Sequence, residues 1–86
     1  METATDIRIP GLHRYPNLGG QSGVVAYAAR RNAIAVEFTD GKVYLYSYEV
    51  PGRHHVERMK SLADEGIGLS TYISRHVGNR FAARLR

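Results

Sequence analysis

The sequence contains no cysteine and no long apolar run. A chain without cysteine cannot form disulfides, thiolate metal sites or a cysteine nucleophile. Because no apolar stretch approaches the roughly 20 residues that span a bilayer, we expect no membrane contact. The first residues, 1–6, are acidic and lack the charged-then-apolar order of a secretory signal. Together these absences predict a soluble, cytoplasmic protein.

Acidic residues are missing from the last part of the chain. After Glu65 the only charged side chains are four arginines, Arg75, Arg80, Arg84 and Arg86. Residues 1–49 carry five basic and five acidic side chains, whereas residues 50–86 carry seven and three, which supplies the whole net charge of +4. Such an asymmetry favours a polyanionic partner. The competing interpretation is a solvated basic surface that promotes solubility.

Prolines and paired glycines make the first part of the chain irregular. Pro10, Pro16 and Gly19-Gly20 argue against a helix there, so we expect an extended arm. A chain of 86 residues, 43% of them hydrophobic, is long enough for one domain with one core. The expected segments are an N-terminal arm over residues 1–21, a folded domain over 22–80 and a basic C-terminal tail over 81–86.

Alternating side chains predict three antiparallel strands, which lie over residues 23–29, 33–39 and 42–48. Asp40-Gly41 separates the last two strands and is typical of a hairpin, because glycine accepts a positive φ without steric cost. Val50-Pro51-Gly52 then ends the sheet.

An apolar stripe at helical spacing predicts a first helix, and Gly66 is placed to end it. The stripe consists of Val56, Met59, Leu62 and Ala63. A second helix is expected to begin with Ser70 as its N-cap and to stop at Gly78-Asn79. Its inward side chains should be Tyr72, Ile73, His76 and Val77. The predicted fold class is α+β, a three-stranded antiparallel β-meander followed by two short helices packed on one face.

Three tyrosines share one face of the third predicted strand, since side chains alternate along a strand. They are Tyr44, Tyr46 and Tyr48, called the tyrosine row below. On a small basic domain such a row is either a wall of the core or a platform on which bases stack. The register of the hairpin decides between the two.

Two registers are open to the hairpin. If 40–41 is a two-residue turn, Val36 faces Leu45 and the tyrosine row lies opposite the core, accessible to a ligand. If 39–41 is a three-residue loop with a bulge at Gly41, the pairing slips by one residue. The tyrosine row then shares a face with Val36 and becomes part of the core. The residues alone do not decide between these registers.

The motifs of the central part of the chain resemble the KTSC domain. The resemblance rests on Ser22, Tyr27, Ile34-x-Val36-x-Phe38, Gly41, the Tyr-x-Tyr motif at Tyr44 and Tyr46, Val50-Pro51, and the stretch from Gly66 to Ile73. This family is named after the C-terminal domain of some lysyl-tRNA synthetases and also occurs as small free-standing bacterial proteins. It implies the β-β-β-α-α order over residues 22–80 and a suggested role in RNA binding. Its pairing of the apolar row with Tyr-x-Tyr suits the three-residue loop better.

The tyrosine row and nearby bases predict a non-enzymatic domain that binds RNA or another nucleic acid. Stacking of a base on an aromatic ring contributes about 1–3 kcal/mol, and cations neutralise the phosphates. The candidate contact residues are Tyr44, Tyr46, Tyr48, Lys42, Arg30, Arg31, Arg53, Arg75 and Arg80. No RNP-like motif, GXXG loop, zinc finger or recognition helix is present. The competing interpretation buries the tyrosines in the core and leaves the arginines merely solvated.

Metal binding and catalysis have little support in the sequence. His54, His55 and Glu57 stand close together, and His76 could join them, but the HExxH spacing and cysteine ligands are absent. No serine lies in a G-x-S-x-G context, and no motif pairs two carboxylates. We therefore expect no metal, no cofactor, no small-molecule substrate and no enzymatic activity.

A protein-interaction module or small inhibitor is the alternative function. A three-stranded sheet leaves an edge strand open, and a partner can add a strand to it. The N-terminal arm could serve the same purpose, and the open edge could also pair two copies of the chain as a dimer.

Overall fold

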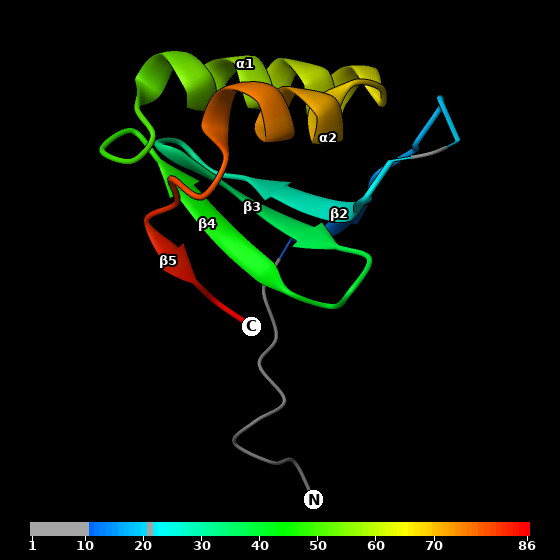
Figure 1. Cartoon of the computed structure of the whole chain (residues 1–86), viewed down its shortest axis with the longest axis horizontal. Helices are drawn as coiled ribbons and strands as arrows, with labels where there is room; N and C mark the ends of the chain where they lie inside the picture. The colour runs from blue at the N-terminus through cyan, green and yellow to red at the C-terminus, as the bar shows by residue number, and fades with distance from the viewer. Residues whose placement is uncertain (1–10, 21) are drawn as a thin grey trace, which may run out of the picture.

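The computed structural model describes residues 11–20 and 22–86 and shows an α+β fold in which the helices cover one face of an antiparallel sheet (Figure 1). The strands are β1 His13–Arg14, β2 Val24–Ala29, β3 Ala33–Phe38, β4 Val43–Ser47 and β5 Ala83–Arg84. The helices are α1 Arg53–Glu65, α2 Leu69–Tyr72 and the π-helical turn η1 Ile73–Val77. Within the described ranges, no helix is long and apolar enough to cross a membrane.

The sheet has five strands in the order β1-β2-β3-β4-β5, so the prediction of three strands was wrong in this detail. β2, β3 and β4 match the three predicted strands closely. The two additional strands come from the expected arm and tail, where His13 pairs with Tyr27 and Arg84 pairs with Tyr44. Both are two residues long, too short to show an alternating pattern. Residues 1–10 and 21 of the expected arm lie outside the described residues.

The hairpin adopts the three-residue loop. Val36 lies opposite Tyr44, the register that the family resemblance favoured. The Phe38 N–H donates to the Lys42 carbonyl at 2.9 Å, and the Gly41 N–H donates to the Phe38 carbonyl at 2.9 Å. Gly41 has a φ of 87°, as the bulge requires. This register turns the tyrosine row toward the helices.

The first helix forms as the apolar stripe predicts. Its four stripe residues are buried in α1, and Gly66 ends the helix in the left-handed conformation with a φ of 81°. These side chains pack against the inner face of the sheet, on Ile34, Val36 and Tyr46. A smaller cluster of Ala28, Ala35 and Val43 lies on the opposite face of the sheet.

The second helix differs from its prediction at its start. It begins at Leu69 with Gly68 as its N-cap, so Ser70 lies inside the first turn. No side chain caps this end. Leu69 is fully buried, and its N–H donates to the Tyr15 hydroxyl at 3.3 Å. The helix therefore starts one residue before Ser70, the predicted N-cap, and this start places Leu69 in the core.

The second helix also ends in a wider turn than predicted. The Gly78 N–H donates to the Ile73 carbonyl at 2.7 Å, the i to i+5 spacing of a π-helix. Ile73 and Val77 are both buried in this turn. His76, expected to face inward, is exposed, and Tyr72 is half-buried. The inward assignment of His76 was therefore wrong, because the sequence was read with α-helical periodicity.

Candidate nucleic-acid interface

The three residues of the tyrosine row differ in their exposure to solvent. Tyr46 is only 2% exposed, and burial together with the neighbouring Tyr44 raises the pKa of its hydroxyl to about 12. A ring this deeply buried cannot stack on a base. Tyr44 and Tyr48 are half-buried and lie toward opposite ends of β4. Tyr44 and Tyr46 both line an open aromatic pocket, and of these two only Tyr44 is more than marginally exposed.

This aromatic pocket, of about 320 Å³, lies between η1 and the sheet near the hairpin. Its lining residues are Phe38, Tyr44, Tyr46, Ile73, Ser74, Gly78, Asn79 and Phe81, none of them charged. Such a volume is at the lower end of small-ligand sites. Rings dominate its wall: the centroids of Tyr44 and Phe81 are 4.4 Å apart, and those of Phe38 and Tyr44 are 5.9 Å apart. Tyr44 and Phe81 contact each other, so a flat ligand can stack only on the outer face of this pair.

Phe81 completes the pocket, although the sequence assigned it no ligand contact. The chain turns after η1 at Gly78, and the Ala82 N–H then donates to the Leu45 carbonyl at 2.7 Å. This pairing brings Phe81 against Tyr44, far away in the sequence, and the edge of Phe81 also meets Tyr46 at a centroid distance of 6.5 Å. No local pattern signals such a contact, because it depends on the pairing of the tail with β4.

Two basic residues are neighbours of Tyr44 in the sheet, although neither lines the pocket. Arg84 is opposite Tyr44 in the β4–β5 register, so both project from the same face. Lys42 precedes Tyr44 by two residues and shares that face as well. The Lys42 Nζ is 3.8 Å from Asp40 Oδ2, a long pair between exposed side chains that leaves the ammonium in water. Arg84 was not among the predicted contacts, since only the register shows its position.

The remaining predicted contacts lie elsewhere. Arg30 and Arg31 are in the loop between β2 and β3, at the end of the sheet opposite the hairpin. Arg53 begins α1 and lies over the Tyr48 ring, 5.7 Å from its centroid. Arg75 belongs to η1, and Arg80 follows it. The predicted residues therefore form no single surface.

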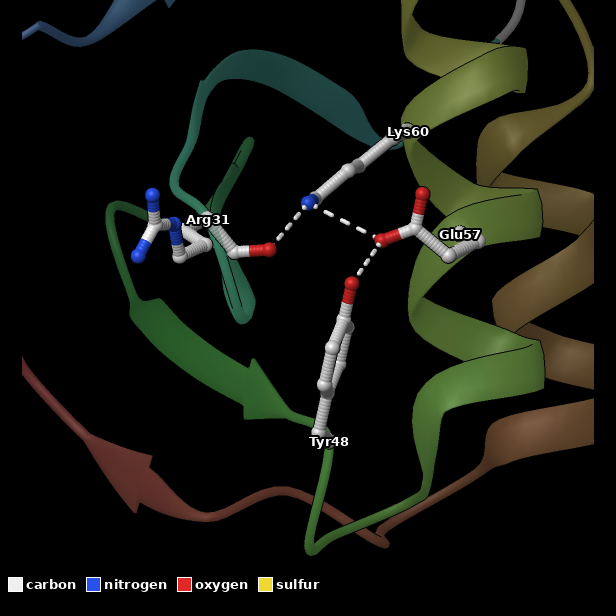
Figure 2. A network of polar contacts seen from close by, with 4 residues as sticks. All are labelled: Arg31, Tyr48, Glu57 and Lys60. Carbon is white, nitrogen blue, oxygen red and sulfur yellow. Dashed lines mark hydrogen bonds and ion pairs between the residues drawn. The ribbon is translucent and has the colours of Figure 1, made fainter.

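Tyr48 is engaged in a polar network that ties α1 to the sheet (Figure 2). Its hydroxyl donates to Glu57 Oε2 at 2.6 Å. Lys60 Nζ donates to the same oxygen at 3.0 Å and to the Arg31 carbonyl at 2.9 Å. The hydrogen bond to Glu57 raises the pKa of Tyr48, and the bonds from Tyr48 and Lys60 lower the pKa of Glu57. We assign Tyr48 a structural role.

The same network includes Glu57, one of the metal ligands considered in the sequence analysis. Glu57 is bound to Tyr48 and Lys60, whereas the hydrogen-bond partner of His55 is Tyr72 of α2. Among the described residues, no group of three or more histidine, cysteine, aspartate or glutamate side chains is arranged to hold a metal ion.

The alternative function, in which a partner adds a strand to the sheet, requires an open sheet edge. In the described part of the chain both edges carry two-residue strands, β1 and β5, which cover the longer β2 and β4. Short edge strands are one way in which proteins limit edge-to-edge pairing.

Comparisons of the chain with family models, with curated protein sequences and with solved structures gave no match. The arguments for function therefore rest on the geometry of the site.

Proposed function

We propose that this protein binds single-stranded nucleic acid, RNA in the first instance, by stacking one base at the aromatic pocket. The observation that carries the proposal is the pair of half-buried rings Tyr44 and Phe81, with centroids 4.4 Å apart at an uncharged pocket. Ser74 and Asn79 lie in the same lining and offer polar groups to the edge of a base.

The phosphates on either side of that base would meet Lys42 and Arg84. Stacking on an aromatic ring contributes about 1–3 kcal/mol per base, and it is tolerant of sequence because every base has a π-face. Each phosphate contact adds a salt-dependent term, with a slope of about −0.7 in log K against log salt for a single strand. We therefore expect modest affinity, weak sequence preference and a shallow salt dependence.

The resemblance to the KTSC domain agrees with this proposal, since RNA binding is the role suggested for that family. Membership of the family stays a prediction. We further propose that the protein acts by binding alone, without catalysis or a cofactor, and that it does so in the cytoplasm.

Fluorescence anisotropy with a short labelled single-stranded RNA tests the proposal. Tyr44→Leu should weaken binding by about tenfold, the loss of one stacking contact. Tyr27→Leu is the matched control, because Tyr27 is another half-buried tyrosine of the sheet that contacts His13 and Tyr15, away from the pocket. Its affinity should stay within about twofold of the original.

Two results would contradict the proposal. One is the absence of binding by the unaltered protein at about 50 mM salt, where phosphate contacts are strong. The other is an equal loss in Tyr44→Leu and Tyr27→Leu. Salt-insensitive self-association or capture of a protein partner, without affinity for RNA, would instead support the interaction module.

A further inference from the structure

Two of the four histidines, His55 and His76, contact Tyr72, and His54 lies beside His55. His55 Nδ1 and the Tyr72 hydroxyl are 2.7 Å apart. The rings of Tyr72 and His76 have centroids 4.8 Å apart, and those of His54 and His55 are 5.7 Å apart. His54, His55, Tyr72 and His76 are called the histidine cluster below.

The charged groups that act on His55 are all basic. His55 has a lowered pKa, through burial first and then through Arg80, His54 and His76. These groups come from α1, from η1 and from the segment after η1. The carboxylate closest to the cluster in sequence, Glu57, accepts hydrogen bonds from Tyr48 and Lys60 instead. The described part of the chain thus supplies no carboxylate that acts on His55.

Arg80 is held in place beside the cluster. Its Nε donates to the Val77 carbonyl at 3.2 Å, and its Nη2 donates to the His76 carbonyl. These bonds satisfy carbonyls at the end of η1, where a cation is favourable. The guanidinium is therefore a fixed positive charge next to side chains that become cationic on protonation.

The π-helical turn connects the cluster with the aromatic pocket. Ile73 and Ser74 of η1 line the pocket, and His76 of the same turn stacks on Tyr72 in the cluster. The pocket and the cluster therefore share one structural element, η1.

We propose that the histidine cluster is a phosphate-binding site that takes up protons when its ligand binds. The inference rests on the proposed function only for the identity of the ligand, a phosphodiester of the same nucleic-acid strand. Histidine is neutral above about pH 7 and cationic below about pH 6, so a bound phosphate favours its protonated form. Affinity at this site therefore rises as the pH falls.

Histidine NMR with inorganic phosphate as the probe tests the site without nucleic acid. At constant ionic strength and about pH 6, phosphate should shift the Cε1–H resonances of His54 and His76. His13 is the internal control, because it lies on β1, beside Tyr27 and apart from the cluster. The shifts should be much smaller at about pH 8, if the site depends on protonated imidazole as proposed. Equal shifts of His13 and the cluster would overturn the inference.

RNA affinity at the same two pH values tests the identity of the ligand. The unaltered protein should bind RNA several-fold more tightly at about pH 6 than at about pH 8. The difference should shrink in His76→Gln and persist in His13→Gln. Tight binding that is independent of pH would overturn the phosphate site and leave the proposed function intact. No RNA binding at either pH would contradict the proposed function, while the phosphate titration would still decide the site.

Discussion

At the scale of single residues, Glu57 shows how one side chain secures a helix. Its carboxylate accepts hydrogen bonds from the Tyr48 hydroxyl at 2.6 Å and from Lys60 Nζ at 3.0 Å. Both bonds favour the ionised form, so the pKa of Glu57 is lowered. Because Lys60 also binds the Arg31 carbonyl, the charge on Glu57 orients a contact between α1 and the loop between β2 and β3 (Figure 2).

Glu57→Gln should reduce stability at neutral pH and have little effect in acid. The folded-state pKa of Glu57 lies below its unfolded value of about 4.3, so its stabilising contribution is present above that value. It is lost as the pH falls through the folded-state pKa. Thermal unfolding should give a lower Tm than the original protein at about pH 7 and a clearly smaller difference in Tm at about pH 3. A deficit of equal size at both pH values would contradict this charge-based role. Glu65→Gln is the control for removing an exposed acid from the same helix.

At the scale of secondary-structure elements, the end of α1 is joined to the described part of the N-terminal arm. The Leu18 N–H donates to the Gly66 carbonyl at 2.8 Å. A Cβ on Gly66 would lie 3.0 Å from Pro16 Cβ, in addition to the strain of its φ of 81°. The glycine thus ends the helix and allows the arm to pack on it.

Gly66→Ala should lower the free energy of unfolding by about 2–4 kcal/mol, the sum of the left-handed strain and the overpacking against Pro16. Urea unfolding measures the difference. Gly19→Ala is the matched control, because a Cβ there would meet only Ile67, at an ordinary contact distance of 3.5 Å. An equal effect of the two substitutions would contradict both the strain and the overpacking assigned to Gly66.

At the scale of the whole molecule, the short strand β5 closes one edge of the sheet. The Leu85 N–H donates to the Val43 carbonyl at 2.7 Å, and Arg86 Nη2 is 3.1 Å from Glu37 Oε2. Leu85 also packs on the outer cluster that contains Val43. The C-terminal segment is therefore part of the sheet and not a separate solvated tail.

Truncation after Ala82 should destabilise the protein and expose the edge of β4. For a domain of this size each kcal/mol lost lowers the Tm by about 4–8 °C. The open edge should also promote self-association, visible as a larger species in light scattering. Arg84→Ala with Arg86→Ala keeps the backbone pairing and serves as the control. A truncated chain that stays monomeric and equally stable would contradict the role of β5.

Local patterns in the sequence determined most of the elements of this protein. Side-chain alternation predicted β2, β3 and β4, and the apolar stripe predicted α1 together with its end at Gly66. These features depend on residues that are close in the chain, so their physical causes can be read from the sequence. The Asp40-Gly41 pair located the hairpin, but the same residues were compatible with a two-residue turn and with a three-residue loop.

Only the tertiary structure decided how distant segments meet. β1 and β5 are held by backbone pairing, for which two residues carry no pattern. Phe81 reaches Tyr44 because the tail pairs with β4, and His55 meets His76 around Tyr72 because α1 packs on η1. The widened turn leaves Ile73 and Val77 buried and His76 exposed, an arrangement that α-helical periodicity does not predict. The two proposed binding sites consist of these long-range contacts, and no local periodicity encodes them.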